Sequence, residues 1–370
     1  MKIVLTFVIL LSLIIGIAGC KSETKEETSA ETSVEYATGF TIEMLTNGVK
    51  KITDGENQTL LLIPEGQKAP ASYEDSIQIS VPIKKAVILS VTFGALMRPL
   101  EVLDSVVGSG TLESELYIEE MKKGYASGQI TYVGGGTMGA PDFEAIQLLK
   151  PDIVFCSTGY ADWVEYYNKL KSMGLKVAVC NDYLETDPLA RLEWIKFIAA
   201  FYGKDATAKT HFEGVVKKIE DIKTQAMLSS QYTTVLWASI FMGSCYVSNG
   251  DSYVAKMIDM AGGHYVFNDL LRSDTSSISL EELYARGKNA RVFIYASTPP
   301  YINSIKEIVE NNPVLADLPA IMSGEVYCFQ PWYFQISDKP DEIVQDLAYI
   351  FYINRIPGYT LKHFMLLPKQ

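Results

Sequence analysis

From residue 81 onward, short apolar runs alternate with stretches whose apolar positions recur at helical spacing. The runs 86–91 and 151–156 are continuous and rich in β-branched residues, which is typical of strands buried on both faces. Similar runs predict further strands that begin near 105, 129 and 175, and the segments between them predict helices up to 103, from 142 and over 163–173. Strands that alternate with helices in this way predict a parallel α/β lobe over residues 81–186.

The pattern changes at residue 187, where apolar positions keep helical spacing for about forty residues and no strand is predicted. Gly203 divides this stretch into a shorter helix and a longer one over 206–227. The α/β alternation then resumes at 233, and a last helix is predicted over 340–353. We therefore predict an α/β fold of two Rossmann-like α/β lobes joined by a long helix. The expected boundaries are 187–228 for the helical connector, 229–337 for the C-terminal lobe and 338–370 for a C-terminal helix and tail.

Before the first lobe, residues 41–64 contain short strand patterns separated by Asn47-Gly48 and Asp54-Gly55. Asn-Gly and Asp-Gly favour the tight turns of β-hairpins. The segment 40–80 is therefore predicted to form an N-terminal β-hairpin or meander extension.

The first twenty residues have the pattern of an export signal. Lys2 precedes an apolar run over 3–15, and small residues lead to Cys20, a pattern that resembles the bacterial lipobox. We expect residues 1–19 to be a lipoprotein signal peptide and Cys20 to be lipidated, the alternative being an uncleaved membrane anchor. Residues 20–39 are mostly polar and are predicted to form a flexible tether. The protein is thus expected to be extracytoplasmic and anchored by lipid to the cell membrane.

Charge and cysteine content narrow the function further. A formal net charge of −12 disfavours nucleic acid, which needs concentrated Lys and Arg. No C-x-x-C pair is present, which disfavours zinc-ribbon and thioredoxin-like sites. Cys156 and Cys180 each end an apolar run and either form a disulfide between neighbouring strands or remain buried thiols.

Four segments together carry a resemblance to a known family. They are the Pro-Asp-Phe-Glu-Ala-Ile segment at 141–146 with Lys-Pro-Asp-Ile-Val-Phe at 150–155, the Pro-Leu-Ala-Arg-Leu-Glu-Trp segment from 188, the Met-Ala-Gly-Gly-His segment at 260–264, and Ser-Leu-Glu-Glu-Leu at 279–283 with Asn-Ala-Arg-Val-Phe at 289–293. In this order they resemble the class III solute-binding proteins that feed ABC importers of siderophores, haem and cobalamin. The resemblance covers about 80–355.

The resemblance implies a mechanism. A metal chelate of iron or cobalt would lie between the lobes, and no further cofactor is expected. Glu144 and Glu281, one from each lobe, would dock on an ABC permease that works with an ATPase subunit. The alternative is that both are first-turn glutamates favoured by the helix dipole. The protein would act as a monomer.

Loop residues after the predicted strands are the candidates for ligand contact. They are Thr92, Phe93, Met138, Tyr160, Trp237, Phe241, Tyr301, Trp332, Tyr333 and Phe334, with Thr137, Ser157, Thr158 and Ser297 as polar neighbours. Aromatic loops suit a bulky organic chelate. Residues 332–334 are favoured most, because three adjacent aromatics do not follow a strand pattern. Trp237 is also compatible with a place in the core.

The chemistry of the remaining residues disfavours two other classes. The chain has three histidines: His211 lies in a predicted helix, His264 in the Gly-Gly turn and His363 in the tail. A bare metal ion would need a cluster of His and carboxylates near the strand ends, and the sequence predicts no such set there. Met138 or Tyr160 remain as axial ligands for haem iron. Arg98 and Lys306 are the obvious basic candidates near the loops, which favours a weakly charged chelate. No Gly-x-Ser-x-Gly or P-loop motif is present, and the sequence predicts no enzyme. A bare-metal-binding protein of the same fold and a non-transport surface lipoprotein remain as alternatives.

Overall fold

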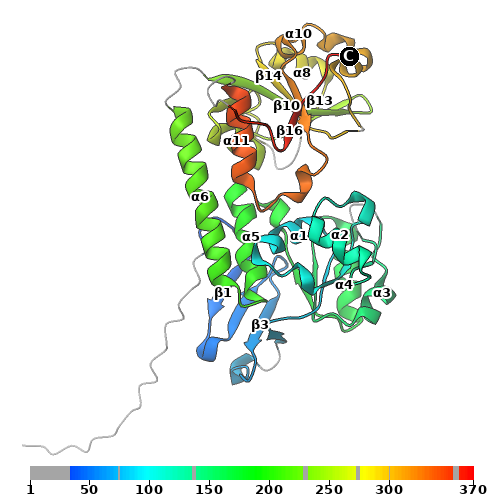
Figure 1. The fold of residues 1–370 in the computed structure, drawn as a ribbon, viewed down its shortest axis with the longest axis vertical. Coiled ribbons are helices and arrows are strands. Elements are labelled where there is room, and N and C mark those ends of the chain that lie inside the picture. The colour runs from blue at the N-terminus through cyan, green and yellow to red at the C-terminus, as the bar shows by residue number, and fades with distance from the viewer. Residues whose placement is uncertain are drawn as a thin grey trace, which may run out of the picture.

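The computed structural model describes residues 34–73, 76–135, 139–227, 232–271, 276–299, 301–352 and 358–370. Two α/β lobes are stacked end to end, and the helix α6 (Asp205–Met227) runs beside both of them (Figure 1). Each lobe has its own sheet with helices on its faces. The predicted fold class, two α/β lobes joined by a long helix, is confirmed.

The N-terminal lobe is built on a five-stranded parallel sheet of order β7-β6-β5-β8-β9. Its central strands are fully buried because helices cover both faces of the sheet. The strands are β5 (Ala86–Ile88), β6 (Val106–Ser109), β7 (Thr131–Tyr132), β8 (Ile153–Cys156) and β9 (Val177–Val179). The helices are α1 (Val91–Met97), α2 (Glu119–Ala126), α3 (Phe143–Leu149) and α4 (Ala161–Ser172).

The C-terminal lobe has a seven-stranded mixed sheet. The parallel strands are β10 (Thr233–Phe241), β12 (Gly263–Tyr265), β14 (Val292–Tyr295) and β15 (Val326–Phe329). Three antiparallel strands complete it: β11 (Ser244–Val247), β13 (Ser276–Ile278) and β16 (Phe364–Leu366). The helices are α7 (Tyr253–Met260), α8 (Leu280–Gly287), α9 (Ile305–Asn311) and α10 (Pro319–Ser323).

Three helices join the lobes: α5 (Pro188–Ala200), α6 and α11 (Pro340–Phe351). The Asp187 carboxylate caps α5 by accepting the Leu189 N–H at 2.9 Å, and Pro188 occupies the first turn, where its missing N–H costs nothing. Every residue of α5 except Arg191 is buried, including Glu193 and Lys196. A helix that is buried all round forms part of the core, so α5 packs into the body of the molecule.

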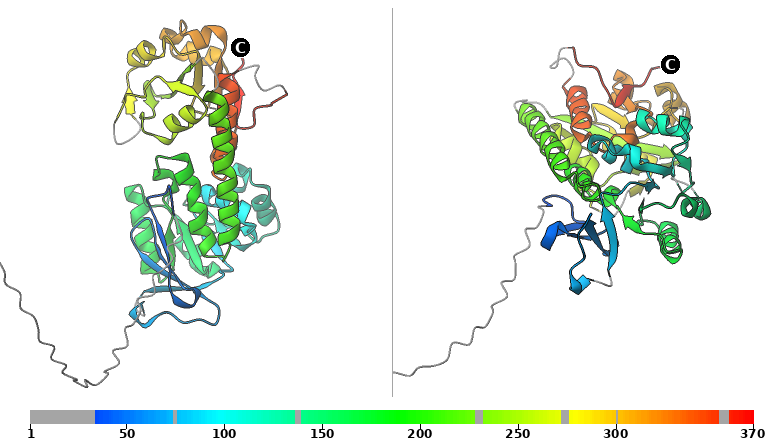
Figure 2. Two further views of the ribbon diagram at one scale, coloured as in Figure 1. Left: turned by 90° about the vertical axis from the view of Figure 1, so that its left-hand side faces the viewer. Right: turned by 60° about the horizontal axis from the view of Figure 1, so that its bottom comes forward.

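The N-terminal extension is a four-stranded sheet of order β1-β2-β3-β4 at the end of the molecule away from the C-terminal lobe (Figures 1 and 2). Its strands are β1 (Thr41–Met44), β2 (Lys50–Thr53), β3 (Thr59–Pro64) and β4 (Ile77–Val81). The Asp54-Gly55 turn pairs with the edge strand β9: Gly55 N–H donates to Val179 O at 3.0 Å, and Asp54 Oδ2 accepts the Val179 N–H at 3.0 Å. The turn therefore covers an otherwise open sheet edge.

The root of the predicted tether is held on α5. Glu193 accepts the backbone N–H groups of Glu35, Tyr36 and Ala37 at 2.7–3.1 Å. Glu185 accepts those of Thr38 and Gly39, each at 2.9 Å. The prediction of a free tether up to residue 39 is therefore wrong for 34–39, because two carboxylates satisfy its backbone donors. Cys20, the signal peptide 1–19 and the rest of the tether lie outside the described residues.

Local signals also misplaced the start of α1. The strand was predicted to continue to residue 91 and to be followed by a loop, but the strand ends at Ile88 and α1 begins at Val91. Ser90 caps this helix, since its hydroxyl accepts the Thr92 N–H at 3.3 Å. Thr92 and Phe93 are therefore helical residues, which changes where their side chains lie.

Candidate functional site

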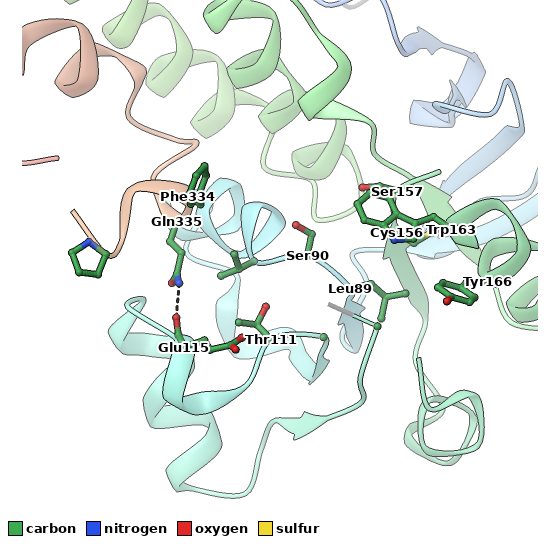
Figure 3. Close-up of a pocket in the computed structure, with 14 residues that line it drawn as sticks. Leu89, Ser90, Thr111, Glu115, Cys156, Ser157, Trp163, Tyr166, Phe334 and Gln335 are labelled. Carbon is green, nitrogen blue, oxygen red and sulfur yellow. Dashed lines mark hydrogen bonds between the residues drawn. The ribbon is translucent and has the colours of Figure 1, made fainter. Parts of the chain in front are cut away.

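A cavity of about 310 Å³ lies between the lobes. The N-terminal lobe lines it with the segments that follow the four parallel strands β5, β6, β7 and β8, at their carboxyl ends, where open α/β sheets bind ligands. The C-terminal lobe closes it with the segment after β15 (Figure 3). The lining residues are Leu89, Ser90, Val91, Gly110, Thr111, Glu115, Gly135, Cys156, Ser157, Trp163, Tyr166, Pro331, Phe334 and Gln335.

Gln335 connects the two lobes at this cavity. Its side chain is buried, and its Nε2 donates to Glu115 O at 2.7 Å (Figure 3). Its Oε1 accepts the Tyr117 N–H at 2.8 Å. A primary amide suits this place because it offers a donor and an acceptor to a backbone segment. Gln335 thereby fixes the segment 115–117 of one lobe against the other lobe.

An ion pair makes a second connection between the lobes. Arg98 lies at the end of α1, and its guanidinium donates to both carboxylate oxygens of Asp338, just before α11, at 2.5 and 3.1 Å. Asp338 is almost fully buried, and burial raises the pKa of its carboxyl while the Arg98 guanidinium opposes that rise. Arg98 is therefore engaged by protein. The candidate role of a ligand-gripping cation does not fit it.

Aromatic rings form one wall of the cavity. Trp163 contacts Tyr160 with ring centroids 4.7 Å apart and Tyr183 with centroids 5.8 Å apart. Tyr160 and Tyr183 are stacked at 6.3 Å. Gly159 is needed beside this cluster, because a Cβ atom at this position would overlap the Tyr183 hydroxyl. Within this cluster Trp163 lines the cavity, whereas Tyr160 and Tyr183 contact Trp163 without lining the cavity. Trp163 and Tyr166 present flat apolar faces with polar edges to whatever fills the cavity.

A second chamber of about 300 Å³ lies next to α5, and Phe334 borders both spaces. It is lined from both lobes and from the connecting helices. The lining residues are Thr92, Asp182, Tyr183, Pro188, Arg191, Tyr253, Met257, Tyr333, Phe334, Ile336, Ser337, Pro340 and Ile343. Asp182 begins the short 3-10 helix η6 (Asp182–Leu184), and its burial raises the pKa of its carboxyl to about 7, while Arg191 opposes the rise.

The raised pKa of Asp182 predicts a pH-dependent stability of the empty protein. The fold favours the protonated carboxyl, so this contribution is complete below about pH 4 and is lost as the pH rises through 7. Between pH 5 and pH 8 the free energy of unfolding should fall by about 3 kcal/mol through this group. Asp182→Asn should remove that loss, measured by urea unfolding at both pH values against the exposed control Asp162→Asn. Equal pH dependence in the two variants would contradict the assignment.

The structure brings several predicted ligand residues to these spaces. Phe334 borders both, Thr92 and Tyr333 line the second chamber, and Ser157 lines the first. Tyr160 belongs to the aromatic cluster and is 61% exposed. Trp332 lies 6.0 Å from Tyr117 between ring centroids. Neither Tyr160 nor Trp332 lines either space.

Other predicted residues are not at the site. Phe93 is fully buried in the core, and Trp237 is buried against Phe329 and Phe364, so neither can touch a ligand between the lobes, and both predictions are wrong. Phe241 and Tyr301 are exposed, but they line neither space. Met138 and Thr137 lie outside the described residues, and Thr158 is buried. Ser297 lines neither space.

Sequence reasoning missed residues that the structure places at the cavity. Trp163 and Tyr166 are three residues apart in the first turns of α4, so they lie on one helix face that points to the cavity. The sequence gives no signal for Arg191 as a site residue, because it lies in a helix that the pattern predicts as a connector. Its guanidinium lies 3.6 Å from the centroid of the Tyr253 ring and donates to Glu185 O and Tyr183 O at 2.8 and 2.6 Å.

Glu144 and Glu281 occupy equivalent places in the two lobes. Each is exposed and follows a capping residue by two positions: Asp142 accepts the Ala145 N–H at 2.9 Å, and Ser279 accepts the Glu282 N–H at 3.2 Å. Backbone and Ser279 hydrogen bonds lower the pKa of Glu281. Both carboxylates therefore face solvent.

Within the described ranges no group of three or more His, Cys, Asp or Glu side chains is placed to hold a metal ion. His211 and His363 contact Asp338 O and Glu342, at 2.9 and 2.8 Å. Cys156 and Cys180 lie on adjoining chain segments as buried free thiols whose pKa is raised by burial. None of the helices in the described part of the chain is long and apolar enough to cross a bilayer.

Comparison with known proteins is consistent with this architecture. A sequence model described as periplasmic binding protein matches residues 96–331. An uncharacterized lipoprotein of Methanocaldococcus jannaschii is 31% identical over 332 residues, which cover 86% of this chain and 78% of the relative.

Two solved structures share the fold at lower identity. A periplasmic haem-binding protein from Pseudomonas aeruginosa is 19% identical with a TM-score of 0.60, covering 75% of this chain and 96% of that one. A siderophore-binding protein from Vibrio cholerae, solved with Fe3+-Desferal, is 16% identical with a TM-score of 0.54, covering 72% and 99%.

Proposed function

Because this chain belongs to the periplasmic binding protein family, we propose that it captures a metal chelate between its lobes and delivers it to an ABC importer. Proteins of this family bind solutes and are not enzymes. The observation that carries the proposal is the cavity between the lobes, with an aromatic wall on one side and Phe334 and Gln335 on the other.

The chemistry of the lining supports an organic chelate over a bare ion. Trp163, Tyr166 and Phe334 offer ring faces, and Ser90, Thr111 and Ser157 add hydroxyl groups. A bare metal ion would need converging His, Cys or carboxylate ligands. A ferric siderophore is the proposed chelate, with haem or cobalamin as further candidates. The likeness to proteins that bind haem and Fe3+-Desferal agrees with this class.

Delivery and anchoring complete the proposal. Glu144 and Glu281 would contact the permease, because exposed charges at matching places on the two lobes can guide encounter with a two-subunit surface. Cys20 would carry the lipid that keeps the monomer at the outer side of the cell membrane. The lipoprotein names of two relatives and the pattern before Cys20 support this.

Direct titration tests the ligand. Haem, ferric desferrioxamine and cyanocobalamin should be titrated into the protein while tryptophan fluorescence is recorded, because Trp163 lines the cavity. At least one chelate is expected to bind and to quench the emission. Phe334→Ala should weaken that binding by about tenfold, since aromatic side chains between surfaces supply a large part of binding energy.

The matched control is Tyr301→Ala, which removes an aromatic ring that is 80% exposed and lines neither space. It should leave the dissociation constant unchanged. If no chelate binds, or if both variants bind as well as the parent protein, the proposal is wrong.

A further inference from the structure

The second chamber contains polar atoms that the protein itself does not satisfy. Four buried side-chain atoms in the described part of the chain have no hydrogen-bond partner, and three of them belong to residues that line this chamber. They are Asp182 Oδ1, Tyr183 Oη and Tyr333 Oη. Buried polar groups are nearly always paired, so three such atoms around one cavity point to an occupant.

Because these polar atoms are buried, leaving them without a hydrogen-bond partner costs free energy. Asp182 is 3% exposed and Tyr333 is 5% exposed, and both line the chamber. An unpaired polar group in such a place loses its hydration without gaining a bond. Tyr183 is half-buried, and its hydroxyl lies against Gly159, so it depends less on an occupant than the other two.

The charges around the chamber define what the occupant offers. Arg191 brings a guanidinium that is held by two backbone carbonyls and pairs with no carboxylate in the described contacts, so its positive charge remains on the chamber side. Below pH 7, where the raised pKa keeps Asp182 protonated, its carboxyl and the two phenols add three O–H donors. A cation and O–H donors together match the oxygen atoms of an acid group.

We infer that the second chamber binds a carboxylate group, carried either by the chelate as an arm or by a separate small acid. Arg191, Tyr183 and Tyr333 hold its oxygens, and Asp182 shares a proton with it. The inference rests on the proposed function only where the carboxylate belongs to the chelate. Phe334, which borders both spaces, then lies between the metal-bearing part and the acid group.

Carboxylate binding in this chamber takes up a proton above the pH at which Asp182 ionises. The titratable and charged groups packed around it are Cys180, Tyr183, Glu185, Asp187, Arg191, Tyr253, Lys256 and Tyr333. Lys256 is paired with Asp187 at 3.3 Å, and the buried Glu185 acts on Asp182 as Arg191 does, with the opposite sign. Arg191, Glu185 and Asp182 therefore set the local charge. Affinity is therefore expected to fall by up to about tenfold per pH unit above 7.

Tartrate is the probe for the chamber, because both of its carboxyls stay ionised across the range tested. It should raise the melting temperature of the whole protein at pH 6 and much less at pH 8.5. Asp182→Asn keeps the shape and offers an amide donor, so it should bind tartrate equally at both pH values. Tyr333→Phe should weaken binding at pH 6, whereas Tyr301→Phe, the exposed control, should not.

Two further arms identify the source of the carboxylate. If haem, which carries carboxylates, competes with tartrate while ferric desferrioxamine does not, the acid group is an arm of the chelate. If the chelate and tartrate bind together, the acid is a separate molecule. Each result supports the inference.

The inference is overturned if tartrate gives no shift at pH 6, or if Tyr333→Phe and the parent protein respond alike, since the chamber then holds only water. A tartrate shift without any chelate binding leaves the chamber site and removes the proposed function. Chelate binding without a tartrate shift leaves the proposed function and removes the chamber site.

Discussion

Glu193→Ala is expected to lower the free energy of unfolding by about 3–5 kcal/mol, because it removes one partner of a buried ion pair. Glu193 is fully buried, and its carboxylate accepts a hydrogen bond from the Lys196 ammonium at 2.6 Å. It also accepts three backbone N–H groups of residues 35–37. Urea unfolding of the parent protein and the variant, each monitored by tryptophan fluorescence, measures the change.

Glu213→Ala is the matched control for this prediction. Glu213 lies on α6 and pairs with Lys209 at 3.8 Å, but both side chains are exposed, so the change should be under about 1 kcal/mol. Limited proteolysis gives a second readout: the segment 34–39 should become a cleavage site in Glu193→Ala and stay resistant in the control. A loss of less than 1 kcal/mol in Glu193→Ala would show that this segment is not held by the carboxylate.

The double variant Glu144→Ala with Glu281→Ala is expected to cut delivery by about thirtyfold or more and to leave chelate affinity unchanged. Losing one interfacial charge contact on each lobe removes both steering and contact with the permease. Uptake of the radiolabelled chelate into vesicles that contain the permease and its ATPase measures delivery. Fluorescence titration of the same variant measures affinity.

The control removes the same charge elsewhere. Glu120 on α2 and Glu310 on α9 are exposed glutamates, and their double replacement by alanine changes the net charge equally. Transport should then stay close to that of the parent protein. Reduced chelate affinity in the Glu144 and Glu281 variant, or equal transport loss in both variants, would refute the docking assignment.

The parts of the fold that depend on local signals could be predicted from the sequence. Asp187 and Pro188 mark the start of α5, and Gly203 marks the break before α6, because capping and backbone freedom act within a few residues. The strand β16 was not predicted, since three residues near the C-terminus become a strand only by pairing with β15. The extended prediction over 86–91 failed because β-branched residues favour strands, while the cap at Ser90 decides the helix.

The site could be predicted only in outline. The sequence placed ligand contacts after the strands and favoured residues 332–334, of which Tyr333 and Phe334 border the spaces found. It could not show that Gln335 bonds to residues more than two hundred positions away. Nor could it separate Phe93 and Trp237 from exposed aromatics, because burial depends on which neighbours the tertiary fold brings.

The burial of nearly every residue of α5 limits how the protein can exchange solutes. Every residue of α5 except Arg191 is buried. A wide rotation of one lobe relative to the other would therefore expose buried apolar and ionic groups of this helix to water. Uptake and release should therefore proceed through small local openings at Gln335 and at the Arg98–Asp338 pair. The residence time of a bound solute then depends on contacts between the lobes. Substitutions at Arg98 or Asp338, which line neither space, should therefore change that time without changing the shape of the cavity.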